Sequence, residues 1–60
     1  MTLERLQQLS PGDKVYHKNP MRRVPYPATV IELLGKEHVL VEFPNGKRMV
    51  KSCRTLEETP

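Results

Sequence analysis

The sequence is poor in cysteine, aromatic residues and long apolar runs, and each shortage excludes a class of protein. Its single cysteine, Cys53, cannot form an internal disulfide, and a free thiol in a chain whose first residues lack a secretory leader favours the reducing cytoplasm. The longest apolar stretch, residues 28–34, is interrupted by Glu32 and is far shorter than the roughly 20 residues that cross a bilayer. We therefore expect a cytoplasmic protein without membrane insertion.

Catalytic and metal-binding motifs are also missing. There is no glycine-rich phosphate loop and no nucleophile elbow, and no motif around Cys53 marks it as a catalytic thiol. His17, His38 and Cys53 are single potential ligands that lie far apart, without the spacing of a metal site. The sequence therefore predicts a protein that is not an enzyme and that has no metal and no cofactor.

The stretch 38–51 has the pattern of a β-hairpin. Val39, Val41 and Phe43 fall at every second position, as on one face of a strand, and Asn45-Gly46 is a preferred dipeptide of two-residue type I′ turns. This turn would pair Phe43 with Arg48, Glu42 with Met49, and Val41 with Val50. We then expect Val50 on the apolar face, and a charged face that carries Leu40, Glu42, Lys47, Met49 and Lys51. A bulge after Gly46 would move Arg48 off the apolar face.

Shorter elements surround this hairpin. Thr2 can cap a helix with Leu3 and Leu6 on its apolar side, and the residue before Pro11 ends it. Strands are predicted over residues 13–18, 28–34 and 55–57, with a proline-rich loop over 19–27 and a 3₁₀ link over 52–54. The apolar alternation in 28–34 changes parity, which indicates a bulge near Ile31-Glu32. The pattern is mainly β: a small five-stranded barrel behind a short N-terminal helix.

Several of these segments resemble a known family. Gly12-Asp13-Lys14-Val15 and residues 28–31, 39–43 and 56–57 resemble an SH3-like barrel of the Tudor and KOW kind. The chain is similar to the C-terminal Tudor-like modules of bacterial DNA-repair helicases, which share Gly-Asp-x-Val and a histidine, here His17. It is also similar to the C-terminal barrels of retroelement integrases, which share a Pro-Tyr pair, here Pro25-Tyr26. The resemblance implies a single five-stranded SH3-like barrel over 11–58, after a helix within 1–10, that binds DNA or docks on a polymerase or another protein.

Positive charge is concentrated in the predicted barrel. The whole chain has a net charge of +3, whereas residues 13–54 hold nine Lys or Arg and four acidic residues, a net charge of +5. Such a field favours anionic partners, although surface charge can also simply keep a small domain in solution. Tyr16, between Lys14 and Lys18, could stack on a base or could cover apolar surface with its hydroxyl in water.

Two functional hypotheses follow. The first is a small, non-enzymatic nucleic-acid-binding accessory module that contacts the phosphates of DNA or RNA with little sequence preference. Its predicted contact residues are Lys14, Tyr16, Lys18, Arg22, Arg23, Lys47, Arg48, Lys51 and Arg54. The second is a protein-docking adaptor that binds a larger complex through the barrel surface and the helix. Its predicted contact residues are Leu40, Met49, Leu3 and Leu6. The charge asymmetry favours the first hypothesis.

Overall fold

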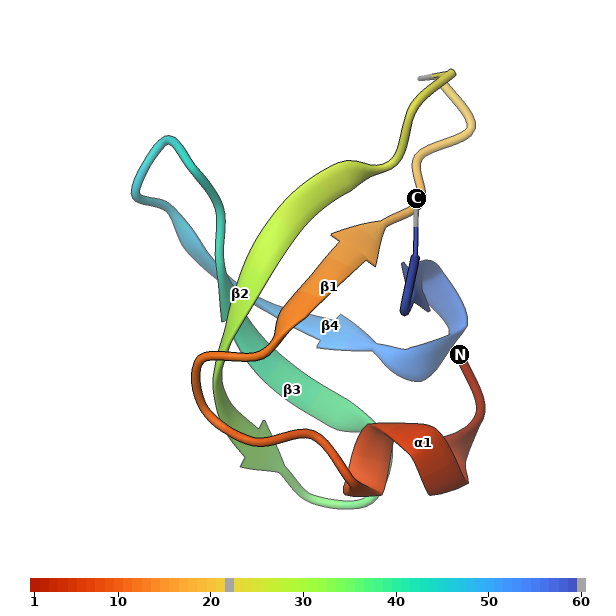
Figure 1. Cartoon of the computed structure of the whole chain (residues 1–60), viewed down its shortest axis with the longest axis vertical. Helices are drawn as coiled ribbons and strands as arrows, with labels where there is room; N and C mark the ends of the chain where they lie inside the picture. Colours follow the sequence, from red (N-terminus) through yellow and green to blue (C-terminus); the bar gives the residue numbers. More distant parts are fainter. Residues whose placement is uncertain (22, 60) are drawn as a thin grey trace.

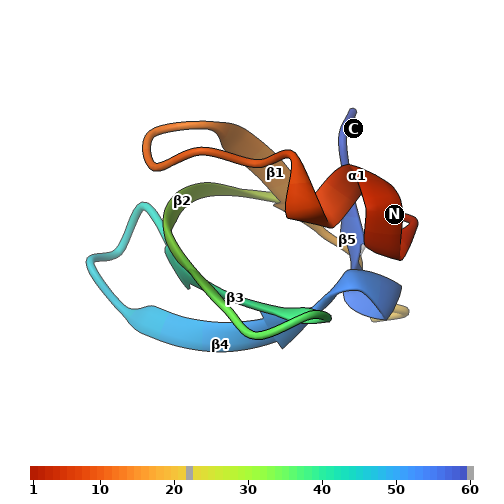
Figure 2. The ribbon, with the colours of Figure 1, turned by 90° about the horizontal axis from the view of Figure 1, so that it is seen from below.

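The computed structural model describes residues 1–21 and 23–59, which form one curled antiparallel sheet and a short helix. The strands lie in the order β4-β3-β2-β1-β5 and make a half-barrel that is compatible with an SH3-like barrel (Figure 1, Figure 2). The elements are α1 (Leu3–Gln7), β1 (Lys14–His17), β2 (Tyr26–Leu34), β3 (His38–Glu42), β4 (Arg48–Ser52), the 3₁₀ helix η1 (Cys53–Thr55) and β5 (Leu56–Glu57). The predicted fold class is confirmed. No helix among the described residues has the length and apolar character to cross a membrane.

The long strand β2 bends because it contains a bulge. Its register with β3 shifts between Val30 and Glu32, which leaves Ile31 without a partner in the ladder. Before the bulge Ala28 and Val30 point into the barrel, and after it Leu33 packs against the core instead. The extra residue therefore resets which side chains face inward, as the change of parity in the sequence indicates.

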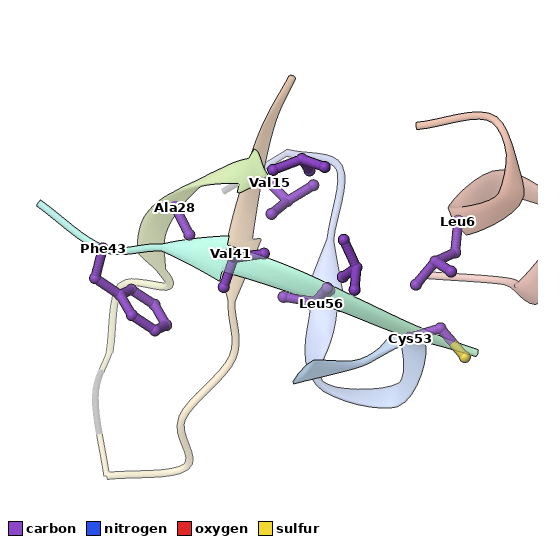
Figure 3. Close-up of a cluster of buried hydrophobic side chains, with 9 residues drawn as sticks. Leu6, Val15, Ala28, Val41, Phe43, Cys53 and Leu56 are labelled. Atoms are coloured by element: carbon purple, nitrogen blue, oxygen red, sulfur yellow. The ribbon is translucent and has the colours of Figure 1, made fainter. Parts of the chain in front are cut away.

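The core runs from one end of the half-barrel to the other. Its buried side chains are Leu6, Val15, Ala28, Val30, Val39, Val41, Phe43, Cys53 and Leu56. Phe43 lies at one end of this cluster, whereas Leu6 and Cys53 lie at the other (Figure 3). Cys53 is thus a buried thiol.

Helix α1 covers the Leu6 end of the barrel of its own chain. Thr2 caps it, since the Thr2 Oγ1 accepts a hydrogen bond from the Arg5 N–H at 3.2 Å. Leu6 is fully buried, and Gln7 Nε2 donates to the Lys36 carbonyl at 2.6 Å. The Arg5 Nε also donates to the Glu58 carboxylate at 2.7 Å. A helix of so few residues is stable because it packs here, not by itself.

The β3–β4 turn differs from the sequence prediction. The Gly46 N–H donates to the Phe43 carbonyl at 2.9 Å, and the Phe43 N–H donates to the Lys47 carbonyl at 2.8 Å. Gly46 has a φ of 87°, whereas no described residue other than glycine has a positive φ. Pro44 and Asn45 are therefore the central residues of a type I turn, followed by a bulge at Gly46. Proline is favoured at the first central position of this turn because its ring fixes φ.

The bulge changes the register of the hairpin by one residue, so the predicted pairing is wrong. The observed partners are Glu42 and Arg48, Val41 and Met49, Leu40 and Val50, and Val39 and Lys51. Val50 lies on the outer face and is 54% exposed, instead of joining the apolar face. Met49 and Lys51 lie on the inner, apolar face of the hairpin. Arg48 lies on the outer face, as expected for a bulge after Gly46. Leu40 and Met49 therefore do not share a face.

Candidate functional site

Three ring side chains, two from strands and one from the residue after β3, gather at the end of the barrel away from α1. His17 in β1 and Tyr26 in β2 are cross-strand partners, and Phe43 follows β3. Tyr26 stacks on Phe43 with ring centroids 5.4 Å apart and planes at 14°. His17 meets Phe43 edge to face, with centroids 5.9 Å apart. We call this group of His17, Tyr26 and Phe43 the aromatic end.

A lysine lies against the aromatic end. The Lys51 Nζ is 6.0 Å from the centroid of the Phe43 ring, a distance at which the ring quadrupole attracts a cation. Partial burial and, second, the charge of Lys51 hold the pKa of His17 below its usual range. The imidazole of His17 is therefore neutral near neutral pH. Because Lys51 supplies a positive charge here, the site is suited to an anionic ligand rather than to a second cation.

The long β1–β2 loop contributes another cationic surface. Lys18, Asn19, Pro20, Arg23 and Pro25 line a surface hollow of about 370 Å³. The Lys18 Nζ is 2.5 Å from the Glu57 carboxylate, and this contact holds the pKa of Glu57 below its usual value. Arg23 is therefore the stronger candidate for an anion contact in this hollow. Arg22, which the sequence also predicts as a contact residue, lies outside the described residues.

On the outer face of the sheet, positive charge is partly offset by acidic residues. Lys14, Thr29, Glu42 and Arg48 are successive partners across four strands. The Arg48 Nε donates to the Glu42 carboxylate at 3.0 Å. Tyr16 is half-buried between its strand partners Pro27 and Glu57.

The predicted nucleic-acid contacts therefore do not lie on one face. Lys14, Tyr16 and Lys18 share the outer side of β1, as the alternation predicts. Lys51 lies on the inner side of β4, so its predicted place on the charged face of the hairpin with Leu40 and Glu42 is wrong. Arg54 follows Cys53 in η1, and Cys53 lies at the Leu6 end of the core (Figure 3). Lys47 flanks the aromatic end, because its carbonyl accepts from Phe43.

The predicted protein contacts are also separated. Leu6 is in the core and cannot meet a partner, whereas Leu3 is 50% exposed on α1. Leu40 is half-buried on the outer face. Met49 is 44% exposed on the opposite side of the sheet, so the predicted joint surface of Leu40 and Met49 is absent.

Sequence reasoning missed the aromatic end. His17 is two positions from Val15 and shares its face of the strand, so the sequence predicts a strand residue near the core. Phe43 is likewise predicted to be a core residue. The available signal was the shared parity of His17 and Val15, together with the small number of rings in the chain. The three rings come from separate parts of the chain, and they meet only because the sheet curls.

The cations without an acidic partner are the groups most open to an anion. Within residues 1–21 and 23–59, the basic side chains that lie beyond ion-pair distance of any carboxylate are Lys14, Arg23, Lys36, Lys47, Lys51 and Arg54. In the same residues, no three His, Cys, Asp or Glu side chains gather as a metal site would require. Comparisons of the chain with protein-family models, with curated proteins and with solved structures find no match.

Proposed function

We propose that this chain is a small, cytoplasmic, non-enzymatic nucleic-acid-binding accessory module of the Tudor and KOW kind. The observation that carries the proposal is the position of Lys51 beside the aromatic end, where its ammonium group has no carboxylate partner among the described residues. Proteins that bind nucleic-acid strands combine cations that track phosphates with rings that can contact bases. Lys47 and Arg23 add positive charge near these rings and along the adjoining loop.

The charge pattern supports contacts to phosphates rather than to base edges. Lys14, Arg23, Lys47 and Lys51 are lysine and arginine side chains without acidic partners in the described part of the chain. Lys18 and Arg48 each already pair with a carboxylate, so they add less to the attraction. Binding of this kind releases counterions, and we expect the affinity to fall steeply as the salt concentration rises. DNA and RNA are both acceptable ligands on this basis.

A salt-dependent titration tests the proposal. The protein would be titrated into fluorescently labelled single-stranded and duplex DNA and RNA at low and at physiological salt. We expect binding at low salt, and a loss of several-fold in affinity in the Lys51→Gln variant. Lys36→Gln is the control, because Lys36 also has no acidic partner among the described residues but is more exposed than Lys51 and lies beside α1. The proposal is wrong if no nucleic acid binds at low salt, or if the two variants lose affinity equally.

A protein-docking adaptor is the second candidate function. It is favoured by the exposed apolar side chains of Met49 and Val50 on β4 and of Leu3 on α1. An affinity purification after nuclease treatment separates the candidates, because only a docked protein survives that treatment in stoichiometric amount.

A further inference from the structure

The two edges of the sheet differ in how they are covered. At the β5 edge, the Leu56 carbonyl accepts a hydrogen bond from the Met1 ammonium group at 2.7 Å. On its other side, the Thr55 carbonyl accepts from the Lys18 N–H at 2.8 Å, which continues the pairing of β5 with β1. At the other edge, β4 pairs with β3 and with no further strand among the described residues, and it lies along the margin of the ribbon (Figure 2). The β4 edge is thus the open edge of this half-barrel.

The hydrogen-bond pattern shows which backbone groups of β4 are open. Residues opposite each other in an antiparallel pair alternate between hydrogen-bonded and non-hydrogen-bonded partners. Phe43 bonds Lys47 and, at the other end of the hairpin, the Cys53 N–H donates to the Glu37 carbonyl at 3.1 Å. The backbone N–H and C=O groups of the odd-numbered residues from 47 to 53 therefore point toward β3. The N–H and C=O groups of Arg48 and Val50 point away from it, toward solvent.

The side chains of this edge are suited to an added strand. Met49 and Val50 are 44% and 54% exposed and lie on opposite faces of the sheet, so a neighbouring strand would cover apolar surface on both sides. Lys47, Arg48 and Lys51 place three cations along the same edge, and Glu42 pairs with one of them. Lysines on an open edge disfavour pairing with a second copy of the chain, because like charges would face each other.

We propose that the β4 edge accepts an extended acidic segment of a partner protein as an additional strand. The main-chain groups of Arg48 and Val50 would supply the hydrogen bonds, and alternate apolar side chains of the segment would cover Met49 and Val50. Its carboxylates would meet Lys47, Arg48 and Lys51. This proposal does not rest on the nucleic-acid proposal, since its hydrogen bonds come from the backbone of the edge, although both proposals use the charge of Lys51.

A proline substitution tests the edge with little disturbance of the barrel. Val50→Pro removes the outward N–H and costs no hydrogen bond to β3, because Val50 is in a non-hydrogen-bonded pair. Val50→Thr is the matched control, since threonine keeps the N–H and the β-branched shape. The probe is a blocked peptide of alternating glutamate and valine, titrated against the isotope-labelled protein by NMR. We expect Val50→Pro to weaken binding about tenfold or more, and Val50→Thr to bind within about twofold of the original.

Amide hydrogen exchange in the unaltered protein gives a second readout that does not depend on the variant. Free protein should exchange the amides of Arg48 and Val50 quickly and those of Met49 and Lys51 slowly, and the peptide should slow the first pair. The proposal is overturned if the peptide leaves these two amides unprotected, or if a lysine–valine peptide binds as well. It is also overturned if they become protected only as protein concentration rises, which would indicate self-pairing, or if an oligonucleotide protects them and the peptide does not.

Discussion

The Lys51 ammonium lies 6.0 Å from the centroid of the Phe43 ring, on the inner side of the hairpin. This contact exists because the bulge at Gly46 shifts the pairing by one residue and so turns Lys51 from the outer side of β4 to the inner side. The same shift brings positive charge close enough to His17 to depress its pKa. One turn residue thus determines the electrostatics of the aromatic end.

Removal of this charge should change the titration of the histidine. In the Lys51→Gln variant we expect the pKa of His17 to rise, because the second cause of its depression is gone. It should stay below its usual range, because partial burial is the larger cause and remains. NMR titration of the His17 ring protons measures this. Lys36→Gln should leave the curve unchanged, and an unaltered His17 pKa in Lys51→Gln would contradict the contact.

The stability of the fold should fall in mild acid. The pKa of His17 is lower in the folded protein than in the unfolded chain, so the unfolded chain takes up the proton first. The contribution of His17 is fully present above about pH 6.5 and is lost as the pH falls through the folded pKa. Urea unfolding at several pH values should show a decline that His17→Gln reduces. His38→Gln, at an exposed position, controls for loss of an imidazole, and an equal effect of both would refute this assignment.

The docking of α1 predicts a sharp difference between its two leucines. Leu6→Ala should destabilise the domain by about 2–5 kcal/mol, because it leaves a cavity in the core. Leu3→Ala should change stability by only about 0.5 kcal/mol or less, since Leu3 is half exposed. Urea or thermal unfolding checks both. Leu6→Met keeps the volume and should cost less than about 1.5 kcal/mol, and equal costs for Leu3 and Leu6 would argue against docking.

The turn should be sensitive at Gly46 and tolerant at Asn45. Gly46→Ala should cost about 1–2 kcal/mol, because alanine is strained at a φ of 87°, although its Cβ would meet no atom within 4 Å. Asn45→Ala should lose only the hydrogen bond from the Lys47 N–H to Asn45 Oδ1, about 1 kcal/mol. A type I′ turn would instead make both positions costly. Unfolding free energies of the two variants therefore distinguish these turns.

Local patterns in the sequence predicted much of the fold, and long-range geometry accounts for the rest. The cap at Thr2 and the bulge near Ile31 are encoded by neighbouring residues, and both are confirmed. The hairpin register was predicted wrongly because Asn45-Gly46 is a strong signal, and Pro44 outweighed it by fixing the first central position of a type I turn. Such a slip inverts every side chain of β4.

The candidate site was predicted less well than the fold. A count of charges identified a basic domain, but the carboxylates that offset Lys18 and Arg48 are known only from the packing of the strands. Likewise, Tyr26 and Phe43 are far apart in sequence, and their stacking depends on how strongly β2 bends. Sequence alternation assigns a side chain to a face, whereas curvature decides which faces meet.

The bulge at Ile31 makes β2 sensitive to length. In its first half the even-numbered residues, Ala28 and Val30, point inward, and in its second half the odd-numbered Leu33 does. A deletion of Ile31 would merge the two halves into one uninterrupted alternation. Leu33 would still face inward and Glu32 outward, so this deletion would remove the bend without exposing the core, whereas deletion of a neighbouring residue such as Thr29 would keep the bulge and turn Ala28 outward.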